Sequence, residues 1–233
     1  MVDIRHTWEK SLRKMVTIRT SRHAEKEYAV MKSFDIPQIV KPIELREGLL
    51  VLPYHPEREA DGAAGYCTER LAWKFLHDIA SALMQIHRKG YVHNGIRLSG
   101  ISIGKECFVL SDFGSCVPAK ECAGDAADDI WALGAAVFHL LMGVELWGGK
   151  GMEIQKPDTV IPTLRRDLYS SGLSDMIAAC LSYDRKGRPT AEDVACKAAM
   201  MMPERNAKTV IRKTYRPEGN IPYEDIWPEA MTD

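Results

Sequence analysis

The segment DDIWALGAAVFHLLMG, residues 128–143, constrains this chain more than any other feature of the sequence. After its two aspartates nearly every side chain is apolar, so a helix built from it is hydrophobic on all sides. Such a helix is stable in water only when other elements surround it. No apolar run in the sequence approaches the ~20 residues of a membrane span. The segment therefore predicts a buried helix at the centre of a protein lobe.

The residues on its N-terminal side predict a small, strand-rich lobe. Alternation in KMVTIRT (14–20) indicates a strand, and SRHAEKEYAVMKSF (21–34) fits a helix that Ser21 could cap. Residues 36–55 fit two short strands around a charged turn, and the polar stretch 55–65 fits a linker. We place this lobe at residues 1–56.

The larger lobe, residues 57–202, is predicted to be mostly helical. Apolar residues recur at spacings of three and four between Thr68 and Gly90, and further helices are expected near 173–182 and from Thr190 onward. Together the two lobes predict an α+β fold. Residues 203–233 form a third region, a tail rich in proline and aromatic residues.

Composition is typical of a globular protein, and its acidic and basic residues are nearly balanced in number. The chain of 233 residues has 45% hydrophobic and 27% charged residues, with 31 basic and 32 acidic side chains. This balance gives no support for nucleic-acid or membrane binding. Six cysteines without C-x-x-C or zinc-finger spacing predict reduced thiols. With a charged start that does not fit a signal peptide, the expected location is cytoplasmic.

Several motifs, in family order over roughly residues 14–200, make the chain resemble a protein kinase. YVHNGIRLSGI is similar to the catalytic loop Y-x-H-R-D-x-K-x-x-N, and SDFG matches the metal-binding D-F-G. DDIWALG resembles the central D-x-W-x-x-G helix, DRKGRPTAEDV the later D-x-x-x-R-P-[ST] segment, and VTIR stands where V-A-I-K belongs. EYAVMKSFDIPQIVKPI is similar to the regulatory helix and the strand after it. The resemblance implies a two-lobed protein-kinase-like fold, with one helix in the small lobe.

The same resemblance identifies catalytic positions that have lost their side chains. Gly95 stands where the family has its Asp base, and Gly100 stands where it has a metal-binding Asn. No G-x-G-x-x-G precedes residue 19, so we expect a truncated small lobe. The activation segment between Asp112 and Asp129 is short and lacks A-P-E. We therefore predict no catalytic residue, no metal site and a pseudokinase.

Three charged residues are candidates for any nucleotide binding that remains. Arg19 takes the place of the family's strand Lys, and Glu27 has the position of the helix Glu. The two side chains either form an ion pair that fixes the helix or let Arg19 bind phosphate, although a planar guanidinium does not replace an ammonium geometrically. Asp112 either binds a metal ion, or pairs with Arg19 or Arg97, or caps the turn that follows.

The remaining positions are of two kinds. Leu52 and Tyr54 lie where adenine would sit, so they are further candidates for nucleotide contact. Other positions keep the side chains that the resemblance expects to hold the larger lobe together: His93, Phe113, Asp129, Trp131 and Arg188. Structural residues are kept while catalytic residues are lost.

The predicted function is that of a catalytically inactive pseudokinase acting through protein–protein interaction, as a scaffold, an allosteric regulator or a decoy. The expected partner is a protein, such as an active kinase or another signalling protein, and no ATP or magnesium cofactor is expected. The alternative is a degenerate but active ATP-dependent transferase or kinase that uses Arg19, Glu27 and Asp112.

The tail offers one candidate surface for a partner. Tyr215, Tyr223 and Trp227 lie among three prolines, in a sequence that cannot form a regular helix or a central strand. Aromatic residues next to acids suit a partner's groove. The other interpretation is a strap that folds back onto its own domain.

Overall fold

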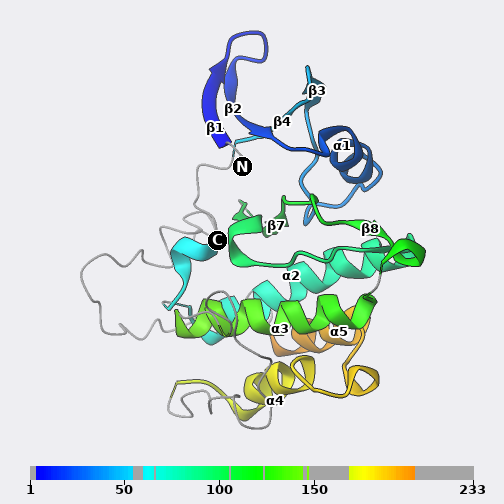
Figure 1. The fold of residues 1–233 in the computed structure, drawn as a ribbon. Helices are drawn as coiled ribbons and strands as arrows, with labels where there is room; N and C mark the ends of the chain where they lie inside the picture. The colour runs from blue at the N-terminus through cyan, green and yellow to red at the C-terminus, as the bar shows by residue number, and fades with distance from the viewer. Residues whose placement is uncertain are drawn as a thin grey trace.

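The structure is a computed structural model, and it describes residues 4–54, 60–65, 67–104, 106–122, 124–143, 146 and 168–202. A small sheet with one helix lies above a larger, mostly helical lobe (Figure 1). The predicted α+β class and the two-lobed arrangement are confirmed. The expected boundary between residues 56 and 57 falls in 55–59, outside the described residues. The tail from residue 203, with Tyr215, Tyr223 and Trp227, also lies outside them.

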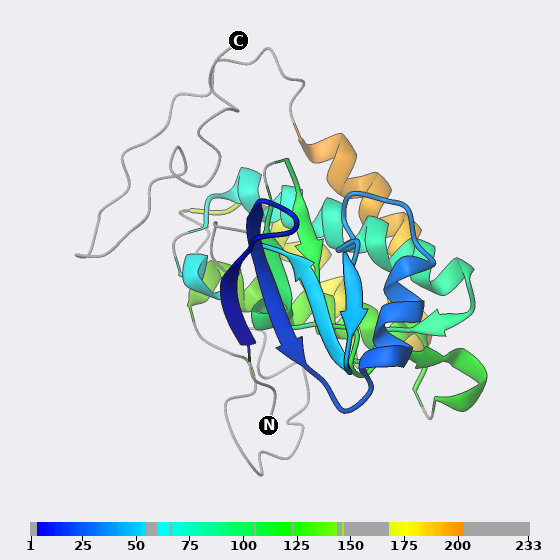
Figure 2. The ribbon, with the colours of Figure 1, turned by 90° about the horizontal axis from the view of Figure 1, so that it is seen from above.

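The small lobe contains an antiparallel sheet with the strand order β1-β2-β4-β3. Its strands are β1 (Ile4–Glu9), β2 (Lys14–Thr20), β3 (Glu44–Arg46) and β4 (Leu49–Pro53). The β3–β4 turn is tight because Glu47 and Gly48 adopt positive φ angles of 50° and 76°. Seen from above, β1 forms one edge of the sheet, and α1 lies beyond β3 at the other (Figure 2).

Helix α1 (Ala24–Lys32) follows β2, but it does not begin where the sequence suggested. Its N-cap is His23, which makes no side-chain capping hydrogen bond. The Ser21 hydroxyl instead accepts a hydrogen bond from the His23 backbone N–H at 3.1 Å and donates one to Glu27. The expected cap at Ser21 was wrong, since Ser21 orients a carboxylate on the first turn of the helix.

The larger lobe is built around two long helices, α2 (Glu69–Arg88) and α3 (Ala126–Met142). Two shorter helices, α4 (Ser171–Cys180) and α5 (Ala191–Met201), follow in the described part of the chain. Thr68 caps α2, and α3 and α5 each begin with a capping box, at Asp125 and Thr190. Most of the apolar side chains of α3 are buried, as its composition predicts.

Short elements join these helices and carry the loops of the site. The strands are β5 (Tyr91–Val92), β6 (Ile101–Ile103), β7 (Phe108–Leu110) and β8 (Val117–Pro118), paired as β5–β8 and β6–β7. Within the described ranges, 3₁₀ helices span Ala60–Ala63, Leu98–Gly100, Ala119–Glu121 and Arg185–Gly187. Strands β6 and β7 form a hairpin in which Ile101 pairs with Leu110 and Ile103 with Phe108.

Backbone hydrogen bonds connect the two lobes directly. Leu110 donates to the Gln38 carbonyl at 2.8 Å, and its own carbonyl accepts from Val40 at 3.0 Å. The two lobes are therefore joined by backbone pairing as well as by side chains. All six cysteines lie within the described residues and are free thiols. No described helix combines the length and the apolar character that crossing a membrane requires.

Candidate functional site

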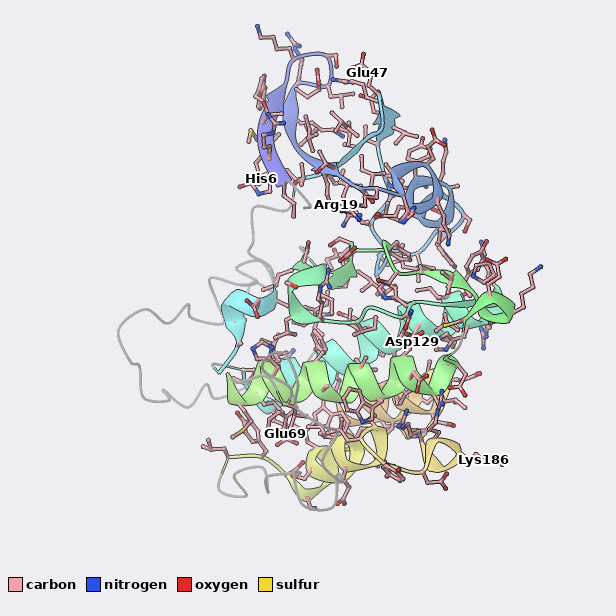
Figure 3. The ribbon with its side chains drawn as sticks, in the orientation of Figure 1. His6, Arg19, Glu47, Glu69, Asp129 and Lys186 are labelled. Atoms are coloured by element: carbon pink, nitrogen blue, oxygen red, sulfur yellow. The ribbon has the colours of Figure 1, made fainter. Side chains whose placement is uncertain are left out.

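Arg19 lies at the junction of the two lobes. It projects from β2 on the face of the small sheet that is turned toward the larger lobe (Figure 3). Its guanidinium forms an ion pair with Glu27 of α1, and the two side chains are only 7% and 3% exposed. Arg19 Nη1 also donates to the Ser111 carbonyl at 3.1 Å, whereas Nε has no partner among the described residues. The ion pair that the sequence offered as one alternative is present.

Asp112 is held by positively charged groups on both of its carboxylate oxygens. Its Oδ1 lies 3.5 Å from Arg19 Nη1 and accepts a hydrogen bond from the Gly114 N–H at 3.2 Å. Its Oδ2 forms an ion pair with Arg97, whose side chain is 62% exposed. Both arginine pairs and the turn contact considered from the sequence therefore exist together. Glu27, Arg19, Asp112 and Arg97 form a row of alternating charges.

The two glycines of the catalytic loop lie in close contact with their neighbours. A Cβ atom added to Gly100 would lie 3.1 Å from Asp112 Cβ, which is tighter than an ordinary van der Waals contact. A Cβ atom added to Gly95 would lie 3.3 Å from both Cβ and Oγ of Ser115. Larger side chains at either position therefore require the neighbouring residues to move.

His93 is fully buried beneath this loop. Neither ring nitrogen has a hydrogen-bond partner among the described residues. Burial lowers the pKa of His93 to about 4, although the carboxylates of Asp129 and Asp112 oppose the shift. The ring packs edge-on against Phe113, with centroids 5.0 Å apart, and Phe113 in turn contacts Phe34 of the small lobe. The His93 and Phe113 rings therefore pack at the junction of the lobes.

Asp129, in the first turn of α3, holds the backbone of the catalytic loop. Its buried carboxylate accepts hydrogen bonds from the N–H groups of His93 at 2.8 Å and Asn94 at 2.7 Å. The His87 ring nitrogen Nε2 lies 2.8 Å from the same carboxylate. Asn94 has a positive φ of 57°, so the loop turns sharply just after this anchor. Figure 3 shows Asp129 on the side of α3 that faces the loop.

Arg188 and Trp131, the remaining two residues that the kinase resemblance singled out, stabilise the larger lobe. Arg188 Nη1 donates to the Ala127 carbonyl at 2.8 Å and lies 3.4 Å from the carboxylate of Asp128. These contacts fasten the segment before α5 to the start of α3. Trp131 is partly buried and packs against the main hydrophobic core.

Leu52 and Tyr54 lie beside a cluster that the sequence did not reveal. Leu52 is buried in the core and pairs with Thr17 across the sheet. The His6 ring lies 5.1 Å from the Tyr54 ring, and its Nδ1 is hydrogen-bonded to Thr17 Oγ1 at 3.1 Å. Side chains of β1 and β2 therefore lie beside the two candidate nucleotide contacts.

Sequence reasoning missed His6 and His87, and it gave Ser21 a different role. His6 and His87 contact residues that are eleven or more positions away, so no local pattern could have found them. Ser21 precedes a helix, which suggests a cap, but its contact with a carboxylate of that helix carries no sequence signal. Within the described ranges, no group of three or more His, Cys, Asp or Glu side chains is placed to bind a metal ion.

Comparison with known proteins gives a consistent picture of the fold. No protein-family model matches the chain. It is 24% identical over 224 residues to serine/threonine-protein kinase 16 of Rattus norvegicus, covering 71% of this chain and 72% of that protein. It is 26% identical over 201 residues to Aurora/IPL1-related protein kinase 2 of Caenorhabditis elegans, an alignment that covers 73% of this chain and 65% of that protein. It is 24% identical over 155 residues to serine/threonine-protein kinase ppk11 of Schizosaccharomyces pombe, an alignment that covers 55% of this chain and 50% of that protein.

A solved structure matches a larger share of the chain than these sequence relatives do. The structure of the Rad53 kinase domain and SCD2 in complex with AMPPNP covers 83% of this chain and 84% of its own. The TM-score is 0.64 at 19% sequence identity, so this similarity concerns the fold alone.

Proposed function

Because the chain is a protein kinase-like protein, in fold and in distant sequence similarity, we propose that it is a pseudokinase that acts by binding a protein partner. One observation carries the proposal. Asp112 is the remaining acidic residue of the expected catalytic set, and both of its oxygens are paired with arginines, while Gly95 and Gly100 contribute no side chain. Phosphoryl transfer depends on a proton acceptor and positioned metal ions, and the loop offers neither.

A magnesium ion does not fit this set of donors. Magnesium requires near-octahedral oxygen coordination, usually through one or two carboxylates together with substrate phosphates. Here the Asp112 carboxylate would have to leave both Arg19 and Arg97 before it could bind the ion. A second ligand at Gly100 is missing, and a side chain there would press on Asp112 itself. This supports a site that works without metal or ATP.

The row of alternating charges also reduces the attraction for phosphate. The two guanidinium groups of Arg19 and Arg97 are balanced by the carboxylates of Glu27 and Asp112. A phosphate that enters must compete with these carboxylates, one of them buried, for the same N–H donors. The charges are therefore better arranged to hold the lobes in one relative position than to receive a nucleotide.

A fixed relative position of the lobes suits a binding protein. Arg19 connects β2 with Glu27 on α1 and with the Ser111 carbonyl of the larger lobe. These contacts hold α1 close to the D-F-G segment without any ligand. A protein partner would then meet a preformed surface, which lowers the entropic cost of association. A partner such as an active kinase or another signalling protein fits this role.

The alternative is an active ATP-dependent transferase that uses Arg19, Glu27 and Asp112. The retained Arg19–Glu27 pair favours it, since an ion pair at this place is part of the family's phosphate machinery. The distant relatives named above are protein kinases, and the Rad53 structure contains AMPPNP. The two functions differ in whether a nucleotide binds.

A thermal-shift titration with ATP, with magnesium, manganese or EDTA, separates them. A nucleotide at 100 times its Kd would add about 2.7 kcal/mol of stability, a rise of several degrees in Tm. We expect no shift and no transfer of labelled phosphate to the chain or to generic substrates. A shift in the wild type that Arg19→Met abolishes and the exposed Arg185→Gln control preserves would establish the alternative.

A further inference from the structure

Three exposed apolar side chains gather in the first hairpin of the small lobe. Ile4, Trp8 and Leu12 are 47%, 58% and 39% exposed, and they make up half of the large hydrophobic residues that are exposed in the described part of the chain. Ile4 and Trp8 lie on the same face of β1, because alternate residues of a strand share a face. Covering these side chains with another segment would remove their apolar surface from water, which is favourable.

The hairpin also presents an edge strand and positive charge. Among the described strands, β1 pairs only with β2, and it lies at one edge of the sheet (Figure 2). The turn after β1 carries the exposed cations Lys10 and Arg13, and β2 begins with the exposed Lys14. The acidic residue nearest to them, Glu9, is already paired with Arg46 at 3.0 Å. The edge therefore suits an extended, acidic segment with apolar side chains.

We propose that residues 223–227 of the same chain, YEDIW, add to the outer edge of β1 as a further strand. This segment lies between Pro222 and Pro228, and the five residues between them include no proline. It carries two acidic and three large apolar or aromatic side chains, which complement the hairpin. Flanking prolines are tolerated at the ends of an edge strand.

One antiparallel register pairs the aromatic residues of the added strand with the exposed apolar residues of β1 on one face of the sheet. With Asp225 opposite His6, Tyr223 is opposite Trp8 and Trp227 is opposite Ile4. Aromatic and apolar cross-strand pairs each contribute favourably, and a carboxylate beside an imidazole is attractive when the ring is protonated. The exposed apolar residues of β1 would then be covered by aromatic residues of the tail.

The chain is long enough to make this contact with itself. About 20 residues separate Met202, where the described part ends, from Tyr223. At about 3.3 Å each they span about 65 Å when extended. A domain of this size is only about 40 Å across, so the tail can reach β1 from any point of the larger lobe.

Carbodiimide cross-linking of the full chain tests the proposal. The reagent joins a lysine amine to a carboxylate that it contacts. We expect amide links from Lys10 or Lys14 to Glu224, the acid that this register places nearer to them, in the monomeric fraction after size-exclusion chromatography. The exposed Lys120 of the larger lobe is the internal control. Equal linkage to Lys120, or links that occur only in a dimeric fraction, would overturn the proposal.

Hydrogen–deuterium exchange gives a second, independent measurement. In the full chain, amides of residues 4–9 should exchange about tenfold more slowly than in a Glu224→Lys/Asp225→Lys variant, the factor that one hydrogen bond of about 1–1.5 kcal/mol produces. Adding Lys10→Glu and Lys14→Glu to that variant should restore the protection, because the hairpin then carries the negative charges and the tail the positive ones. Identical exchange in all three chains would refute the added strand. The outcome does not depend on whether the chain transfers phosphate, so failure here leaves the proposed function unaffected.

Discussion

Arg97 binds the Oδ2 atom of Asp112 on one side of the carboxylate whose Oδ1 atom lies 3.5 Å from Arg19. The two arginines come from different environments. Arg97 is 62% exposed, whereas Arg19 is 7% exposed and also holds the buried Glu27. The same carboxylate thus takes part in one surface ion pair and in one buried network, and the energies of the two should differ greatly.

Substitution of Arg19 should therefore destabilise the protein far more than substitution of Arg97. Arg19→Met leaves Glu27 buried without its partner, which typically costs about 3–5 kcal/mol. Arg97→Met removes an exposed pair, which contributes at most about 1 kcal/mol. Urea unfolding measures both. The double variant Arg19→Met/Glu27→Leu should recover much of the loss, because no uncompensated charge remains. Equal effects of the two single substitutions would contradict the buried network.

Gly134 in α3 should not tolerate even a methyl group. An added Cβ would lie 2.7 Å from Cys180 Cβ and 3.1 Å from Leu181 Cγ, so Gly134→Ala forces α3 and α4 apart. Overpacking of this kind costs about 1–3 kcal/mol. Gly172→Ala is the matched control, because its nearest contact would be Met201 Cε at 3.5 Å. Alanine has the higher helix propensity, so this control should be neutral or stabilising in the same unfolding assay.

The buried His93 should make the protein less stable in weak acid. Its folded-state pKa of about 4 lies below the usual 6.5, so the unfolded chain binds more protons between these values. The contribution of this ring is fully present above pH 6.5. It is lost at up to about 1.4 kcal/mol per pH unit as the pH falls toward 4.

The prediction concerns a difference between variants, because other groups also titrate. Urea unfolding at pH 7.5 and pH 5.0 should show a smaller pH dependence for His93→Leu than for the wild type. His77→Leu is the control, since the side chain of His77 is 31% exposed. If both variants keep the wild-type pH dependence, His93 is not the residue responsible.

Asp129→Ala should release the catalytic loop from α3. The substitution leaves the N–H groups of His93 and Asn94 without their acceptor, at about 1–3 kcal/mol for the buried donor of His93 and less for the part-buried donor of Asn94. Asp125→Ala on the same helix removes an exposed cap and should cost about 1 kcal/mol. Hydrogen exchange of residues 92–97 should accelerate in the first variant only. Unchanged exchange there would show that Asp129 does not anchor the loop.

Local sequence patterns predicted most of the fold correctly. The strand at 14–20, the charged turn between β3 and β4, and the capping box at Thr190 follow from periodicity and residue type, which act over a few neighbouring positions. The boundary of α1 was misplaced because a serine before a helix usually caps it. Here Ser21 contacts Glu27 instead, and only the course of the chain after β2 makes that contact possible.

The sequence alone determined which chemical groups the site has: glycines at 95 and 100, arginines at 19 and 97, and one aspartate at 112. Only the tertiary structure decided how they pair. Arg19 and Asp112 are 93 positions apart, and Asp129 meets the His93 backbone across 36. Ion pairs and hydrogen bonds depend on separations of a few ångströms, and packing of the two lobes sets those separations. No spacing along the chain could have revealed that both oxygens of Asp112 are occupied.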